Sequence, residues 1–155
     1  MHVLKFGGTS VGSPEALEKV VEILKGPDRR EKAAVVVVSA FSGVTDKLID
    51  LRRMAVSGDT AYSETAAALK ERHLETAAHF LSGNELEAAR QNLEAEFSLL
   101  LRVLDGISVL RELSPRSLDL VMSFGECFSA ALIASIFCAK GLPAVYVDSR
   151  ALIKT

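Results

Sequence analysis

The sequence predicts an α/β fold built around a parallel sheet. Two apolar runs, Val3 to Phe6 and AAVVVVSA at 33–40, have the composition of buried strands, and a helical pattern lies between them. A strand, a helix and a second strand in that order form a βαβ unit, whose two strands run in the same direction. Long helical patterns after residue 42 would supply the layers that cover such a sheet.

The first helix is expected between the two strands. Ser13 is a favoured N-cap, and Pro14 suits the first helical position because its missing N–H would have no partner there. Gly26-Pro27 should end this helix at about Lys25. Its apolar residues recur at helical spacing: Leu17, Val20, Val21 and Leu24. The charged turn DRREK at 28–32 then leads into the second strand, whose continuous β-branched run is typical of a central strand covered on both faces.

The rest of the chain is mainly helical. Ser42-Gly43 should begin a second helix with Val44, Leu48, Leu51 and Ala55 on one face. Two long patterns separated by SGN at 82–84 predict an antiparallel helical hairpin over about 60–105. Ser114-Pro115 should begin a last long helix that ends near Gly141. A third strand is predicted from Pro143 to Val147, and SRALIKT at 149–155 should be a helix or loop.

Composition and charge narrow the class of protein. Hydrophobic residues make up 49% of the 155 residues, which is enough for a packed core. The net charge of −2 and the lack of a basic stripe in the sequence give no reason to expect nucleic acid. No apolar run approaches the roughly 20 residues of a membrane span, and the N-terminus is too quickly polar for a signal peptide. We therefore expect a cytoplasmic protein with no membrane contact.

The first candidate site is KFGGTS at 5–10, which follows the first strand. Gly7 and Gly8 would let the backbone come close to a ligand and point N–H groups at phosphate oxygens. Lys5 adds a positive charge, Thr9 and Ser10 add hydroxyl donors, and the next helix points its positive end the same way. The alternative is a plain strand-to-helix turn with an exposed lysine.

Two familiar phosphate motifs do not match this segment. A P-loop requires G-x-x-x-x-G-K-[ST], but Ser13-Pro14 follows the correctly spaced Gly7 and Gly12. A dinucleotide fingerprint requires G-x-G-x-x-G, which Gly7-Gly8-Thr9 interrupts. Neither a P-loop NTPase nor an NAD domain is supported.

The second candidate is SAFSGVT at 39–45, which follows the second strand and begins a helix. Ligands of open parallel sheets bind at the carboxyl ends of the strands, so this segment and KFGGTS could share one site. Ser39 and Thr45 carry hydroxyls suited to a polar ligand. The alternative is that Ser39 and Ser42 only cap the following helix.

The third candidate is SFGE at 123–126. Glu126 interrupts the apolar run DLVMSFGECFSAALIASIF, where a carboxylate is costly unless it is paired. A ligand ammonium would be a suitable partner, and Gly125 would leave space for a ligand or for another backbone segment. The alternative is a salt bridge from Glu126 to a nearby Lys or Arg.

The remaining reactive residues fit structural roles. His73 lies on an apolar helical face and is expected to be a core histidine, while His2 and His79 support no site. Cys127 and Cys138 are expected to be reduced core thiols, because their number and spacing give no zinc site. The clusters DRREK and KER, at 28–32 and 70–72, are expected to be solvated faces.

Together these segments resemble the aspartokinases, which belong to the amino acid kinase superfamily. KFGGTSV at 5–11 looks like the family's opening signature, SAFSGVT is similar to its second motif, and SFGE to its S-x-G-E segment. ERH at 71–73 and VDSRALIKT at 147–155 also look like family segments. Two alternatives remain. One is another superfamily member acting on glutamate, N-acetylglutamate, carbamate or UMP, although KFGGTS and SAFSGVT favour aspartate. The other is a non-catalytic oligomerisation module based on the helical hairpin.

The resemblance implies a fold, a reaction and a set of site residues. The fold would be an αβα sandwich around a mainly parallel sheet, and the reaction an ATP-dependent phosphorylation of the β-carboxylate of L-aspartate. This is the first step of lysine, threonine and methionine biosynthesis. Lys5 would contact the transferring phosphate, with Gly7, Gly8, Thr9 and Ser10 around the phosphates. Aspartate would be bound by Ser39, Thr45 and Glu126, the last facing its ammonium group.

The resemblance also implies cofactors, partners and the part of the catalytic domain that this chain would form. Mg²⁺ would be held by the ATP phosphates, with no metal site on the protein. The partners would be ATP, L-aspartate and further copies of the chain in a homo-oligomer. Residues 1–155 would be the N-terminal part of a catalytic domain, without the nucleotide half and regulatory region. We therefore expect the isolated chain to be inactive.

Overall fold

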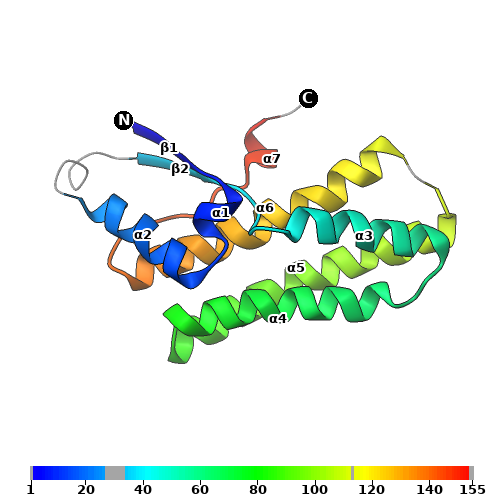
Figure 1. The fold of residues 1–155 in the computed structure, drawn as a ribbon, viewed down its shortest axis with the longest axis horizontal. Helices are drawn as coiled ribbons and strands as arrows, with labels where there is room; N and C mark the ends of the chain where they lie inside the picture. The colour runs from blue at the N-terminus through cyan, green and yellow to red at the C-terminus, as the bar shows by residue number, and fades with distance from the viewer. Residues whose placement is uncertain (1, 27–33, 113, 154–155) are drawn as a thin grey trace.

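The structure is a computed structural model that describes residues 2–26, 34–112 and 114–153. The strands lie along the upper left of Figure 1, with the long helices below them. The elements in chain order are β1 (His2–Phe6), α1 (Gly8–Val11), α2 (Pro14–Lys25), β2 (Ala34–Val38), α3 (Val44–Ser57), α4 (Tyr62–Phe80), α5 (Gly83–Leu110), α6 (Pro115–Ala139) and α7 (Ser149–Leu152). Pro27 and the charged turn DRREK lie outside the described residues.

The sheet contains the predicted βαβ unit. β1 and β2 pair in parallel, in a register that runs from His2 opposite Ala34 to Phe6 opposite Val38. Phe6 and Val38 are half-buried and pack against the core. The other face carries Val35 and Val37, which are 46% and 45% exposed. The prediction of a strand covered on both faces is therefore wrong for this chain, because no described element lies over these valines.

The predicted third strand is absent from the part of the chain that the structure describes. Its residues 143–148 carry no strand assignment, and the described sheet consists of β1 and β2 alone. Val145 and Val147 are 86% and 58% exposed. A strand exists only through hydrogen bonds to a neighbouring strand, and this segment has no such neighbour among the described residues. Apolar, β-prone composition was therefore not sufficient to predict it.

The helix starts follow the sequence closely. Ser13 and Ser114 are N-caps, and their hydroxyl oxygens accept hydrogen bonds from the N–H groups of Ala16 and Ser117. A proline occupies the first helical position after each cap, as predicted. The short helix α1 was not predicted. It follows Gly7 directly and separates β1 from α2.

Helices α4 and α5 form an antiparallel pair. Near the middle of the pair, the Lys70 ammonium lies 2.8 Å from a carboxylate oxygen of Glu94. Further along, the Tyr62 hydroxyl donates to Asp105 at 2.6 Å. The partner numbers rise along one helix as they fall along the other, which shows that the helices run in opposite directions.

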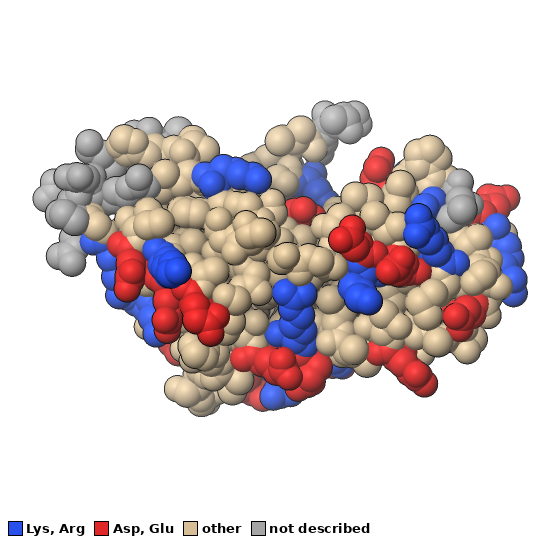
Figure 2. All heavy atoms as spheres, viewed as in Figure 1, with Lys and Arg blue, Asp and Glu red and all other residues tan. Residues whose placement is uncertain are grey.

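Charged side chains of both signs are spread over the surface. On the face drawn in Figure 2, Lys and Arg alternate with Asp and Glu over the helices, and neither sign forms a continuous stripe. Nucleic-acid binding depends on clustered positive charge, which this face does not offer.

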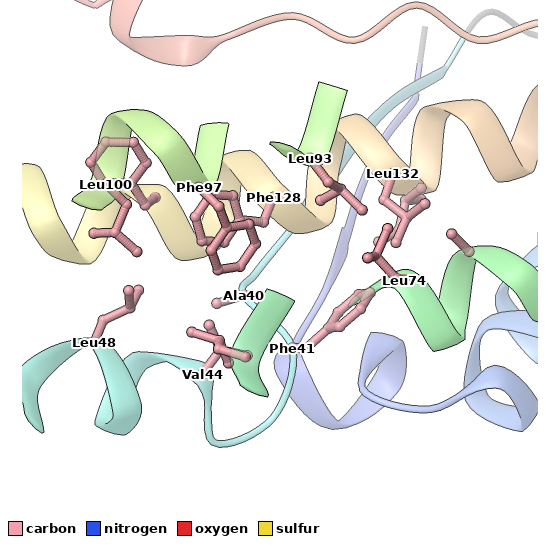
Figure 3. Close-up of a cluster of buried hydrophobic side chains, with 14 of the residues drawn as sticks. Ala40, Phe41, Val44, Leu48, Leu74, Leu93, Phe97, Leu100, Phe128 and Leu132 are labelled. Carbon is pink, nitrogen blue, oxygen red and sulfur yellow. The ribbon is translucent and has the colours of Figure 1, made fainter. Parts of the chain in front are cut away.

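The core lies between the helices and reaches the loop after β2. Phe97 of α5 and Phe128 of α6 stack with their ring centres 4.0 Å apart (Figure 3). Phe41, just after β2, stacks on the buried ring of His73 at 4.9 Å. The Nδ1 of His73 donates to the Leu69 carbonyl oxygen at 2.8 Å, as expected of a neutral core histidine.

Helix α6 forms the centre of this core. Its length and composition alone would allow it to cross a membrane, contrary to the reading of the apolar runs in the sequence. However, 56% of its most apolar window is buried inside the fold, as in the core helix of a soluble protein. Both cysteines are free thiols. Cys127 is buried as predicted, but Cys138 is exposed and does not belong to the core.

His73→Phe should make stability less dependent on pH. Burial lowers the pKa of His73 to about 4 in the folded chain, against about 6.5 when it is unfolded. The stability contributed by the neutral ring is complete above the unfolded pKa and falls as the pH drops toward 4, by roughly 3 kcal/mol in all. Phenylalanine keeps the stack on Phe41 but cannot titrate. Chemical denaturation at about pH 7 and pH 4.5 measures the loss, and an equal loss in both proteins would contradict this assignment.

Candidate functional site

Two loops leave the same edge of the sheet. The first loop, Gly7–Gly12, follows β1 and contains α1, and the second loop, Ser39–Gly43, follows β2. Phe6 and Val38, which end the strands, lie opposite each other in the register. The Ser39 N–H continues the ladder by donating to the Phe6 carbonyl oxygen at 3.2 Å. The parallel pairing therefore places both predicted ligand-binding segments side by side.

The two loops approach each other too closely for side chains. A Cβ on Gly8 would lie 2.8 Å from the carbonyl oxygen of Ala40. A Cβ on Gly12 would lie 3.0 Å from the Ser42 Cβ. Gly8 is thus required by contact between the loops, while a Cβ on Gly12 would also lie 2.7 Å from the Gly8 carbonyl oxygen of its own loop. For Gly8, this requirement is separate from any phosphate contact.

Helix α6 approaches the second loop from the other side. A Cβ on Gly125 would lie 2.9 Å from the Ala40 Cβ. The Ser129 hydroxyl donates to the Ser39 carbonyl oxygen at 2.8 Å. Glu126 accepts a long hydrogen bond of 3.5 Å from the Ala40 N–H. The space at Gly125 was expected to take a ligand or another backbone segment, and the second loop fills it at Ala40.

The structure brings most of the predicted phosphate-binding residues to this edge. Lys5 is exposed near the end of β1, and its Nζ lies 4.0 Å from where a Cβ on Gly7 would be. The ammonium group therefore lies over the start of the first loop. Thr9 is exposed and Ser10 half-buried, both within α1. The exposed Lys5 and Thr9 side chains therefore lie at the same end of β1.

The residues expected to bind aspartate lie beside them. Ser39 is half-buried in the second loop, and Thr45 is half-buried in the first turn of α3. The alternative that Ser39 and Ser42 cap α3 is wrong, because Gly43 is its N-cap and no side chain caps it. Gly43 has a φ of 77°, which glycine adopts without strain.

Glu126 differs from its prediction in one respect. The apolar sequence around it suggested a buried carboxylate, but the side chain is exposed on α6. A burial cost therefore cannot be the reason for a cationic partner. Among the described residues, no salt bridge to Glu126 replaces the proposed ligand contact. Its carboxylate remains accessible beside the second loop.

Arg72 of α4 contacts both loops, and sequence reasoning did not predict this contact. Its guanidinium donates to the Ser42 carbonyl oxygen at 2.8 Å and to the Gly12 carbonyl oxygen at 3.3 Å. KER was expected to be a solvated face: Lys70 fits this, since its ion pair with Glu94 is exposed, whereas Arg72 is half-buried against the two loops. The available signal was the position of Arg72 directly before His73, on the border of the apolar face of α4.

The structure offers no metal-binding cluster among the described residues: no group of three or more His, Cys, Asp or Glu side chains lies together.

A cavity of about 250 Å³ lies between α5, α6 and Tyr146, with Glu96 and Phe128 in its wall. None of the predicted site residues lines it. The candidate site is an open surface at the sheet edge.

A family model described as the amino acid kinase family matches residues 1–154. The chain belongs to the amino acid kinase family. Curated relatives in this family include a bifunctional aspartokinase/homoserine dehydrogenase 1 of Arabidopsis thaliana, which is 34% identical over 96% of this chain. Aspartokinase 3 of the same plant is 39% identical over 86% of the chain. The aspartokinase of Chlamydia trachomatis is 31% identical over 99%.

The matched relatives are much longer than this amino acid kinase chain. It spans 16% of the bifunctional protein, 23% of aspartokinase 3 and 31% of the Chlamydia protein. Among solved structures, E. coli aspartokinase III in complex with aspartate and ADP matches with a TM-score of 0.75 and 23% identity. That match covers 91% of this chain and 29% of the E. coli chain. It confirms the predicted fold class, of which the described residues form an incomplete part.

Gly125→Ala should destabilise the chain, whereas Gly106→Ala should stabilise it. In a helix interior, alanine is favoured over glycine by about 1 kcal/mol. No atom lies within 4 Å of a Cβ at Gly106, so that gain is kept. At Gly125 the new methyl would press on Ala40 and displace the second loop, for a net loss of about 1–3 kcal/mol. Urea denaturation measures the free energy of unfolding of both variants. If both were stabilised equally, the second loop would move aside without cost and the prediction would be wrong.

Proposed function

We propose that this chain is part of an enzyme that transfers the γ-phosphoryl group of ATP to the β-carboxylate of L-aspartate. The observation that carries the proposal is the contact between the two loops, with the Lys5 ammonium over the start of the first loop and Glu126 beside the second. A phosphate-binding segment and an amino-acid-binding segment thereby share one edge of the sheet. The similarity to proteins named aspartokinase favours aspartate as the acceptor.

In this proposal the first loop binds the transferring phosphoryl group. The exposed Lys5 ammonium lies over Gly7, where it can follow negative charge as the phosphoryl group moves. Thr9 and Ser10 would bind alongside Gly7 and Gly8. Mg²⁺ would be held by the phosphates of ATP, since oxygen ligands are what it prefers, and it would neutralise part of their charge.

The second loop and its neighbours would bind the acceptor. Ser39 and Thr45 offer hydroxyls to the aspartate carboxylates, and the exposed Glu126 carboxylate is available for the ammonium group. A carboxylate nucleophile is already ionised at neutral pH, so the reaction requires no general base. The protein's contribution is then to hold two anions close together in the right orientation.

The isolated chain should not turn over. Its site is open to solvent, and phosphoryl transfer requires water to be excluded from the reacting groups. We propose that the parent enzyme is cytoplasmic; several relatives are named chloroplastic, which supports a soluble compartment but not the cytoplasm in particular. We also propose self-association into a homo-oligomer, without nucleic acid or membrane. The exposed valines of the sheet favour contact with further protein.

A coupled assay with ATP and a panel of acceptors tests the function. Aspartate-dependent ADP release by the full-length enzyme that contains this chain would support the proposal. Release dependent on glutamate, N-acetylglutamate, carbamate or UMP instead would assign another amino acid kinase activity. Steady turnover by the 155-residue chain alone would refute its predicted inactivity.

Lys5→Ala should lower kcat of the full-length enzyme about 100- to 1000-fold, while the KM for aspartate changes little. Lys5 is expected to contact the moving phosphoryl group, whose charge differs most in the transition state. Lys19→Ala, which removes an exposed lysine of α2, is the matched control and should leave kcat unchanged. Steady-state kinetics decide this, and a Lys5→Ala enzyme with normal turnover would exclude the role.

Glu126→Ala should raise the KM for aspartate roughly 10- to 100-fold, as expected when a hydrogen bond to a charged group is lost. The KM for ATP should stay near its original value, because the nucleotide does not meet this carboxylate. Asp119→Ala removes an exposed carboxylate from the same helix and serves as the control. Weaker ATP binding with unchanged aspartate binding would reverse the assignment.

A further inference from the structure

Arg72 connects the two loops although it belongs to neither. One nitrogen of its guanidinium donates to the Ser42 carbonyl oxygen at 2.8 Å, and another donates to the Gly12 carbonyl oxygen at 3.3 Å. These acceptors are 30 and 60 residues away in the sequence. Arg72 thus spans the line along which the first and second loops meet.

The chemistry of arginine suits this bridge. The guanidinium is a rigid planar fork that keeps several N–H groups at fixed spacing, whereas a lysine ammonium is a single point on a flexible stem. Hydrogen bonds from a charged donor are also stronger than neutral ones. Arg72 is half-buried, and its bond to Gly12 is partly shielded from water, whereas its bond to Ser42 is exposed. Two carbonyl groups on different loops are therefore held at a set separation.

Helix α4 is itself fixed against the second loop. His73, the next residue, is fully buried and stacks on Phe41 of that loop at 4.9 Å with nearly parallel rings. Arg72 holds the solvent side of the loop through Ser42, while His73 supports its core side. Further from the loops, Lys70 joins α4 to α5 through Glu94.

We propose that Arg72 is a positioning residue that sets the spacing between the phosphate-binding loop and the aspartate-binding loop. This inference rests on the proposed function, and it assigns Arg72 no contact with either reactant. Each loop keeps its own ligand contacts when Arg72 is replaced. What changes is the alignment of the acceptor oxygen with the phosphoryl group, to which transfer rates are very sensitive.

The kinetic test compares R72K and R72M with K70A in the full-length enzyme. Lysine keeps the charge but cannot bridge both carbonyls, and methionine keeps only the apolar stem. We expect kcat to fall about 10- to 100-fold in both Arg72 variants, with the KM values for ATP and aspartate within about threefold of wild type. K70A removes an ion pair from the same helix and should retain kcat. A kcat of R72K within about twofold of wild type would overturn the proposal, as would KM values that rise in step with the loss of kcat.

A second measurement does not depend on the substrate. Amide hydrogen exchange in the 155-residue chain should become faster in the first and second loops of R72K and R72M, but not of K70A. Unchanged exchange in the loops would overturn the bridging role. If the wild-type enzyme phosphorylates no aspartate while the loops still loosen, the proposed function fails and the bridge stands. If the wild-type enzyme phosphorylates aspartate and the Arg72 variants show normal kcat and exchange, the proposed function stands and the positioning role of Arg72 fails.

Discussion

The structure depends on the close approach of three backbone segments around Ala40. This residue is almost completely buried. Its carbonyl oxygen meets Gly8 of the first loop, its methyl group meets Gly125 of α6, and its N–H points to Glu126. Any side chain at either glycine would occupy space that Ala40 already fills. The contact joins the sheet edge to the central helix, and the candidate site is built on top of it.

The contacts of Ala40 explain how the second loop can hold site residues in a defined position. Phe41, the residue after Ala40, is anchored in the aromatic part of the core by its stack on His73, which also contacts Phe128. The second loop therefore shares the rigidity of the helices. Sites supported by packed elements keep their geometry better than sites on unsupported loops. The contacts of Ala40 and Phe41 that pack the core also hold the second loop of the candidate site in place.

Features that depend on neighbouring residues in the sequence were predicted correctly. The caps at Ser13 and Ser114, the βαβ unit and the core position of His73 follow from residue type and spacing. The exposure of Glu126 and the bridge made by Arg72 depend on which distant segments meet, and no periodicity encodes that. The predicted strand at 143–147 belongs with these misses, because a strand is defined by its neighbour. Close approach was predicted at Gly8 for a ligand and at Gly125 for a ligand or another backbone segment, and in both places the second loop makes the contact.

Lys5 lies on the same uncovered face of the sheet as the exposed valines. Lys5 lies opposite Val37 in the register, and alternation along β1 places it on the same face as Val3. Val3, Val35 and Val37 are all substantially exposed on that face. Parallel sheets are normally covered on both sides, so these valines form a surface suited to further protein. An element that packed on them would lie on the same face of the sheet as Lys5, and exclusion of water around an ammonium group strengthens its attraction for phosphate.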